Sequence, residues 1–148
     1  MSSMVETVTG SSDGLSAAAQ LLHDFNVEYD EPSPPPAQIA GRLRDLVEQD
    51  QAVVLVARAD EDAPVGVAVM RVQPSLWSEA HEAYLAELYV VPDRRGQGFG
   101  RELITEAMRA AREQGADYAF LVTSEEDRLA QRLTRRPASA RPKVRAVR

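Results

Sequence analysis

The sequence predicts an α+β fold, an α/β/α sandwich in which helices flank a mixed and mostly antiparallel sheet. Three observations predict this class. Two amphipathic helical segments follow a short first strand, three apolar runs separated only by turns come next, and a helix and one more strand follow the last of these runs. Runs joined by turns pair antiparallel, whereas a strand–helix–strand crossover makes a parallel pair. The 148 residues are enough for one hydrophobic core.

The first third of the chain predicts one strand and two helices. Residues 5–9 are a short strand candidate, and the polar side chains of residues 11–13 can cap the helix that follows. The apolar residues of this helix recur at helical spacing: Leu15, Ala18, Leu22 and Phe25. Four prolines between residues 32 and 36 then interrupt the chain. A second helix presents Ile39, Leu43, Leu46 and Val47 on one face.

The middle of the chain predicts the sheet and its crossover helix. Strands are expected at residues 52–57, 65–72, 82–91 and 117–123. A helix is expected over residues 98–114, with Gly115 as the left-handed residue just after its end. Ser124 can cap a weaker last helix that carries Leu129 and Leu133.

Composition and charge exclude several classes of protein. The chain has no cysteine, so a disulfide scaffold, a thiolate zinc site and a cysteine nucleophile are excluded, and with two distant histidines we expect no metal. Residues 1–127 hold 9 bases and 23 acids, a charge of −14, whereas residues 128–148 hold 8 bases and no acid. The acidic body favours small cationic substrates and disfavours nucleic acid.

The chain gives no sign of export or membrane insertion. Its first residues lack a basic segment followed by an apolar run, and no apolar stretch approaches the length of a membrane span. We therefore expect a cytoplasmic protein with neither a membrane nor a nucleic acid as partner.

A glycine-rich segment between the third and fourth long strands indicates an anion site. Gly96, Gly98 and Gly100 alternate just before a predicted helix, and Arg94, Arg95 and Arg101 add positive charge. Glycines let the backbone come close to a ligand, and the first N–H groups of a helix have no intrahelical partner. The segment therefore suits a pyrophosphate, although a flexible surface turn would also explain a lone glycine triplet.

Two other phosphate-binding loops fit the sequence less well. A P-loop needs a lysine and a hydroxyl residue after its last glycine, where this chain has Arg101 and Glu102. A Rossmann loop has G-x-G-x-x-G directly at the strand end, whereas here four residues intervene and the spacing is G-x-G-x-G. Glu125, near the end of the next strand, keeps the Rossmann alternative open.

Residues 95–100, Arg-Gly-Gln-Gly-Phe-Gly, resemble the acetyl-CoA signature of the GNAT acetyltransferase superfamily. The preceding Leu-Tyr-Val-Val-Pro of residues 88–92 is similar to the strand with which that family holds the pantetheine arm, and the resemblance extends over roughly residues 53–133. The resemblance implies an acetyl-CoA-dependent N-acetyltransferase whose domain spans residues 1–134. It also implies that these residues hold the cofactor: Leu88, Tyr89, Val90, Arg95, Gly96, Gln97, Gly98, Phe99, Gly100 and Arg101.

The same strand offers the catalytic candidates. Residues 84–90 resemble the corresponding strand of spermidine/spermine acetyltransferases, in which acids face the amine, and Glu87 is the acid that matches. We expect Glu87 to be the general base or the anchor of the ammonium, with a solvated or ion-paired strand residue as the alternative. Glu82 and Tyr84 are further candidates for the acceptor site. Trp77 is either a wall of that site or a core residue.

The C-terminal part departs from the family pattern. Thr134 stands where the family has the tyrosine that protonates the thiolate, and no Gly-Phe pair or alternating apolar run follows. We therefore expect the two closing strands to be missing and residues 135–148 to be a basic tail without a packed core element. The tail is interpreted as a truncated or frame-shifted end, with a natural basic extension as the alternative.

The leading functional hypothesis is transfer of acetyl from acetyl-CoA to a primary amine of a small and cationic acceptor. The rivals are a CoA-binding module with little turnover, suggested by the missing tyrosine, and a protein amino-group acetyltransferase. The open sheet edge left by missing strands predicts either a homodimer or a loosely folded monomer.

Overall fold

The computed structural model describes residues 4–10, 12–122 and 146–147. The helices and strands are β1 (Met4–Val8), α1 (Ser12–Glu28), α2 (Pro36–Glu48), β2 (Ala52–Arg58), β3 (Pro64–Pro74), β4 (His81–Val90), α3 (Phe99–Glu113), β5 (Ala116–Val122) and β6 (Ala146–Val147). Short 3-10 turns occupy Asp60–Asp62 and Pro92–Arg94. From β1 to β5 the predicted order of elements is confirmed, with boundaries shifted by one or two residues for most elements.

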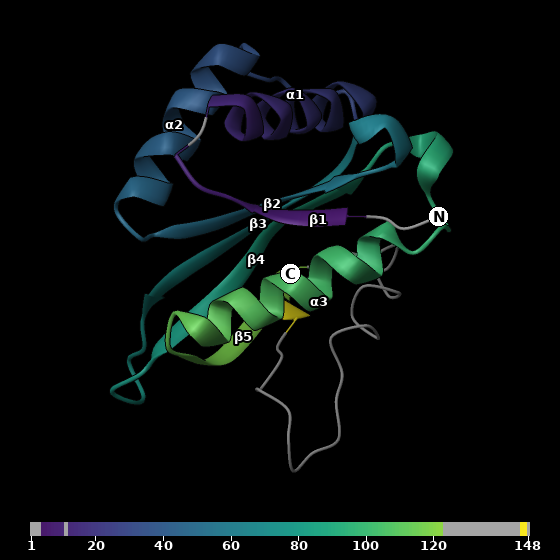
Figure 1. The fold of residues 1–148 in the computed structure, drawn as a ribbon. Coiled ribbons are helices and arrows are strands. Elements are labelled where there is room, and N and C mark those ends of the chain that lie inside the picture. Colours follow the sequence, from purple (N-terminus) through teal and green to yellow (C-terminus); the bar gives the residue numbers. More distant parts are fainter. Residues whose placement is uncertain (1–3, 11, 123–145, 148) are drawn as a thin grey trace.

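The strands form one sheet in the order β1-β2-β3-β4-β5-β6. Neighbours from β1 to β4 are antiparallel, and β4 and β5 are parallel because α3 connects them as a crossover. Helices α1 and α2 cover one face of the sheet and α3 covers the other (Figure 1). This is the predicted α+β sandwich with a mixed, mostly antiparallel sheet.

The sheet separates two apolar layers, and β2 contributes to both. Its side chains alternate, so that Ala52, Val54 and Val56 pack toward α1 and α2, whereas Val53, Leu55 and Ala57 pack toward α3. All six are buried, as expected for a strand near the centre of a sheet that is covered on both faces. The layer below α3 is completed by buried residues of the helix itself: Phe99, Leu103, Ile104, Ala107 and Met108.

Two glycines mark the ends of α3. Gly98, which the sequence placed at the first helical position, is the residue that precedes the helix, with φ of 96°. Gly115 follows the other end with φ of 89°, in the left-handed conformation predicted for it.

The far edge of β5 differs from expectation. The sequence predicts that β5 ends the sheet, yet β6 pairs with it in parallel at Leu121 and Val122. Strand pairing uses backbone groups, so the two-residue strand Ala146–Val147 needs no amphipathic run to form it. The expected last helix and most of the basic tail, residues 123–145, lie outside the described residues.

Candidate active site

Near its C-terminal end, β4 has no strand partner along one edge among the described residues. Its ladder with β3 continues to Val90, but its ladder with β5 ends at Leu85, opposite Leu121. Within the described residues, no strand pairs with the β5-facing edge of residues 86–90. These backbone donors and acceptors are the ones expected to hold the pantetheine arm and the acetyl carbonyl.

A β-bulge at Ala86 sets the direction of the side chains along this edge. Leu85 is opposite Met70 and Glu87 is opposite the next residue of β3, Val69, so Ala86 has no partner of its own. Before the bulge, Ala83 and Leu85 point toward α3. After it, Leu88 and Val90 point toward α3, whereas Tyr89 packs in the α1/α2 layer. The extra residue therefore shifts the alternation, and Glu87 points toward α1 and α2 with Tyr89.

Glu87 lines a cavity of about 220 Å³ between β4 and the two N-terminal helices. The cavity is lined by Leu22, Phe25, Asn26, Pro34, Ile39, Arg42, Leu43 and Glu87. Glu87 is an exposed residue at the rim of this cavity, and partial desolvation of its carboxyl there raises its pKa above the usual value. A carboxylate whose charged form is disfavoured is a better proton acceptor than one in water, because its basicity rises with its pKa.

The glycine loop has an open space in front of it. Gly96 and Gly98 have φ of 80° and 96°, and a Cβ at either would meet no atom within 4 Å. Glycine is needed there for the left-handed backbone and not to relieve crowding within the protein. No side chain caps the N-terminus of α3. The Glu102 N–H donates a hydrogen bond to the carbonyl of Gly98, the residue that precedes the helix. The opening turn of α3 thus leaves N–H groups for an anion.

Arg95, the first residue of the glycine motif, makes contacts that tie the loop to α1 and β4. Its Nη2 atom donates to both carboxylate oxygens of Glu28 at 2.9 Å, and its Nε atom donates to the Val90 carbonyl at 2.9 Å. Its guanidinium also lies 5.6 Å from the centre of the Tyr89 ring. The side chain of Arg95 therefore faces Glu28, and its backbone remains in the loop.

Glu28 and Tyr89 complete this network. The Tyr89 hydroxyl donates to Glu28 Oε1 at 2.9 Å, and its ring stacks on Phe25 with 4.9 Å between ring centres. The hydrogen bond from Arg95 lowers the pKa of Glu28, whereas burial and the bond to Glu28 raise the pKa of Tyr89 to about 12. Glu28, the last residue of α1, thus connects this helix to β4 and to the glycine loop.

The structure brings most of the predicted site residues together but not all of them. Glu87, the strand residues 88–90 and the glycine loop meet at one end of β4. Glu82 and Tyr84 lie further back on the same strand, where Glu82 accepts a bond from Gln73 and Tyr84 stacks on Phe120 at 5.1 Å. Arg42, which was not among the residues predicted from the sequence, also lines the cavity. Its position on the same helical face as Ile39 and Leu43 could have indicated that it lies beside them.

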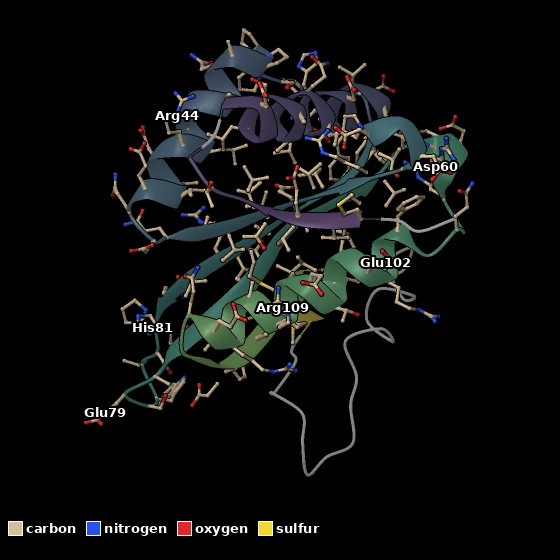
Figure 2. The ribbon with its side chains drawn as sticks, in the orientation of Figure 1. Arg44, Asp60, Glu79, His81, Glu102 and Arg109 are labelled. Carbon is tan, nitrogen blue, oxygen red and sulfur yellow. The ribbon has the colours of Figure 1, made fainter. Side chains whose placement is uncertain are left out.

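Trp77 lies elsewhere in the molecule. It sits in the connection between β3 and β4 with 85% of its surface exposed. Figure 2 shows Glu79, in the same connection, at the opposite end of the molecule from Glu102 in the first turn of α3. Trp77 is therefore neither a core residue nor part of the cavity around Glu87.

The comparisons with known proteins agree with this geometry. The model of the acetyltransferase (GNAT) family matches residues 18–138. The chain belongs to this family. It is therefore an acetyl-CoA-dependent acyltransferase, and an acceptor substrate is implied. Among curated proteins, none matches the chain.

Several solved structures are similar to this acetyltransferase. A candidate acetyltransferase from Arthrobacter sp. FB24 is 30% identical, with a TM-score of 0.74 and coverage of 98% of this chain and 94% of its own. The aminoglycoside acetyltransferase meta-AAC0020 from an uncultured soil metagenomic sample, in complex with trehalose, is 25% identical with a TM-score of 0.74, and the match covers 99% and 94% of the two chains. The ribosomal-protein-alanine N-acetyltransferase of Brucella melitensis biovar Abortus 2308, at 20% identity, a TM-score of 0.70 and coverage of 89% and 88%, shares the fold.

Two searches of the described residues complete the picture of this acetyltransferase. No helix in this part of the chain is long and apolar enough to cross a membrane. The same residues contain no group of three or more histidine, cysteine, aspartate or glutamate side chains placed to hold a metal ion.

Proposed function

We propose that this GNAT acetyltransferase transfers the acetyl group of acetyl-CoA to the primary amine of a small acceptor, with Glu87 as the general base. The observation that carries the proposal is the bulge at Ala86. It directs Glu87 toward the cavity below α1 and α2, directly beside the edge of β4 that lacks a described strand partner. The acceptor amine and the thioester can then meet at this edge. The net charge of −14 over residues 1–127 supports an acceptor that approaches as an ammonium ion.

The reaction divides between the two sides of the strand. Backbone groups of Leu88, Tyr89 and Val90 hold the pantetheine and polarise the acetyl carbonyl, and the loop from Arg95 to Arg101 holds the pyrophosphate. Glu87 removes a proton from the ammonium, directly or through water. The neutral nitrogen attacks the carbonyl carbon, and the C–S bond breaks as the thiolate leaves. The proton that the nitrogen must still lose to become an amide is taken up by the thiolate, directly or through water.

The roles of the remaining predicted residues follow from their positions. Glu82 and Tyr84 precede the bulge and alternate with Ala83 and Leu85, so they share with Glu87 the sheet face opposite α3. They do not line the cavity around Glu87, so in the proposal they would contact only an acceptor that extends beyond this cavity along β4. Trp77 has no role in it.

The substitution Glu87→Gln tests the proposal. It keeps the shape of the side chain and removes the base, so kcat/KM on an accepted amine should fall by about 100- to 10,000-fold. Acetyl-CoA binding, measured by the thermal shift, should remain close to that of the wild type. Thiol release over a panel of primary amines provides the activity.

Glu82→Gln is the matched control, because Glu82 lies on the same strand and already bonds Gln73. It should lower kcat/KM by less than about tenfold, the cost of an ordinary hydrogen bond. Turnover of Glu87→Gln at the wild-type rate across the pH range would remove Glu87 from the mechanism. Acetyl-CoA binding by the wild type with no turnover of any amine would instead favour a CoA-binding module.

A further inference from the structure

The cavity beside Glu87 is built from two matching helical triads. Leu22, Phe25 and Asn26 occupy positions i, i+3 and i+4 of α1, and Ile39, Arg42 and Leu43 occupy the same positions of α2. Residues at this spacing share one face of a helix. Each helix therefore presents two apolar side chains and one polar side chain to the cavity.

Arg42 is the cation that lines this cavity, and it is an exposed residue at the cavity mouth. Arg58, Arg95 and Arg109 form ion pairs with glutamates, whereas Arg42 shares with Arg44, Arg71, Arg94 and Arg101 the lack of such a pair among the described residues. Within the described residues, neither an ion pair nor a hydrogen bond engages the guanidinium of Arg42, although acids outnumber bases in the chain by 23 to 17. An unpaired guanidinium at a cavity wall is suited to a carboxylate, which it can bind through two parallel hydrogen bonds.

The cavity is open to solvent on one side, so its volume limits the part of the acceptor that lies between β4 and the two helices. At about 30 Å³ per water molecule, 220 Å³ corresponds to roughly seven waters. Pockets for drug-sized ligands measure about 300 to 1,000 Å³. Five of the eight lining residues are apolar, so the body of the acceptor is a short apolar group.

From this arrangement we infer that the acceptor is a compact amino acid, in which a short apolar body carries both the amine and a carboxylate. Glu87 faces the ammonium, the apolar residues of α1 and α2 hold the body, and Arg42 binds the carboxylate. The inference rests on the proposed function, since it assigns the second polar contact of the acceptor in the same site. It refines the charge argument, because only the amine needs to be cationic.

A polycationic acceptor fits this cavity less well. A second ammonium would lie against the uncompensated guanidinium of Arg42, and like charges at close range are destabilising. A simple alkylamine would leave Arg42 without a partner and gain nothing from it. The carboxylate is thus the feature that separates the inferred acceptor from other amines.

The first experiment measures binding and does not depend on turnover. Leucine, leucinamide and isoamylamine share one apolar body, and only leucine carries the carboxylate. Each is titrated calorimetrically into the CoA complex of the wild type, of Arg42→Gln and of Arg44→Gln. Arg44 is the matched control, because it lies on α2 but does not line the cavity, and Figure 2 shows it on the outer side of the helix.

We expect leucine to bind the wild type at least about tenfold more tightly than either uncharged-end analogue. Arg42→Gln should abolish this preference and leave the binding of isoamylamine within about twofold, and Arg44→Gln should keep the preference. Arg42→Lys, which keeps the charge but loses the planar fork, should retain part of it. The same series with γ-aminobutyrate and n-butylamine tests whether the amine and the carboxylate are at opposite ends of the body.

Thiol release with the same compounds separates the inference from the proposed function. Arg42-dependent preference for a carboxylate without acetyl transfer would support the inference and contradict the proposed function. Efficient acetylation of isoamylamine and leucine alike, with no effect of Arg42→Gln, would support the proposed function and overturn the inference.

Discussion

The carboxyl group of Glu87 is partly desolvated, which makes its charged form less favourable than in water. Five apolar side chains surround the cavity that it lines, and this desolvation raises its pKa above the usual value. Glutamate in water titrates near about 4.3. A base must be deprotonated to act, so the raised pKa shifts the active form of Glu87 to higher pH.

The pH dependence of kcat/KM should show this shift. We expect an acidic limb whose midpoint lies above that of an ordinary glutamate, because protonated Glu87 cannot accept the proton of the ammonium. In Glu87→Gln the residual rate should lack this limb. Initial rates measured at low acceptor concentration across the acidic range provide the test, and an identical limb in the variant would assign it to another group.

Ionisation of Glu87, which activates it as a base, should lower the stability of the folded protein. A raised pKa in the folded protein means that the charged carboxylate is less favourable there than in the unfolded chain. This cost is absent below the unfolded pKa and complete above the folded pKa. Glu87→Gln should therefore melt at a higher temperature than the wild type near neutral pH, and this difference should disappear as pH falls below about 4.

At the residue scale, sequence reasoning was most successful where a motif fixes the backbone. The placement of Glu87 and of the glycines beside one strand end could be predicted, because strand, loop and helix are contiguous. Trp77 could not be placed, because an aromatic residue in a loop carries no periodicity that indicates what it faces. Arg42 could not be predicted as a site residue, because whether its guanidinium is ion-paired depends on which carboxylates lie near it in the folded protein.

At the element scale, the bulge in β4 separates two parts of the candidate site, the strand backbone beyond Leu85 and the side chains that face α1 and α2. In the proposed mechanism the backbone of the strand holds the cofactor, while Glu87 and Tyr89 project toward α1 and α2. The sequence contains a trace of this bulge. The apolar residues that face α3 fall at 83 and 85 before it and at 88 and 90 after it, so their two-residue period breaks between 85 and 88. A single break of this kind is also compatible with a strand end, which is why the bulge could not be predicted.

The glycine loop and α2 offer a matched pair of glycine substitutions. Gly98→Val should lower Tm, because a β-branched residue at φ of 96° is strained by about 1–3 kcal/mol. It should also abolish the thermal shift produced by acetyl-CoA, because the side chain would fill the open space before the loop. In the wild type, this thermal shift reflects a stabilisation of about 2.7 kcal/mol when the acetyl-CoA concentration is 100 times Kd.

Gly41→Ala is the control for this substitution. Gly41 lies inside α2, has no positive φ, and leaves room for a Cβ, so alanine should stabilise the protein by about 0.4–1 kcal/mol. Its acetyl-CoA shift should equal that of the wild type. Differential scanning fluorimetry measures both variants, and an undiminished shift in Gly98→Val would move the pyrophosphate away from this loop.

At the scale of the whole molecule, the sheet is protected unevenly. Among the described residues, β2 and β3 are paired on both sides, whereas β1 is paired on one side only and the outer edge of β5 is paired by β6 at two residues only. Residues 116–120 of β5 therefore present a strand edge to which no described strand is hydrogen-bonded. Such edges favour association with a second chain.

We expect this edge to make the protein a homodimer or, failing that, an aggregation-prone monomer. Sedimentation velocity over a range of protein concentrations distinguishes the two, and hydrogen exchange reports the protection of β5 in the assembled form. A compact monomer at all concentrations, with the amides of β5 strongly protected, would mean that residues outside the described part of the chain cover the edge. The sequence could indicate this weakness, since no alternating apolar run follows Phe120, but it could not predict the short pairing by β6.

The strand β2 is paired on both sides, by β1 and β3, and gives its side chains alternately to the two apolar layers. Neither layer can therefore melt while the other stays folded, because the loss of β2 would expose both at once. The described domain should behave as a single cooperative unit. Its one thermal transition will report a ligand bound on either face of the sheet, whether at the glycine loop or in the cavity below α1 and α2.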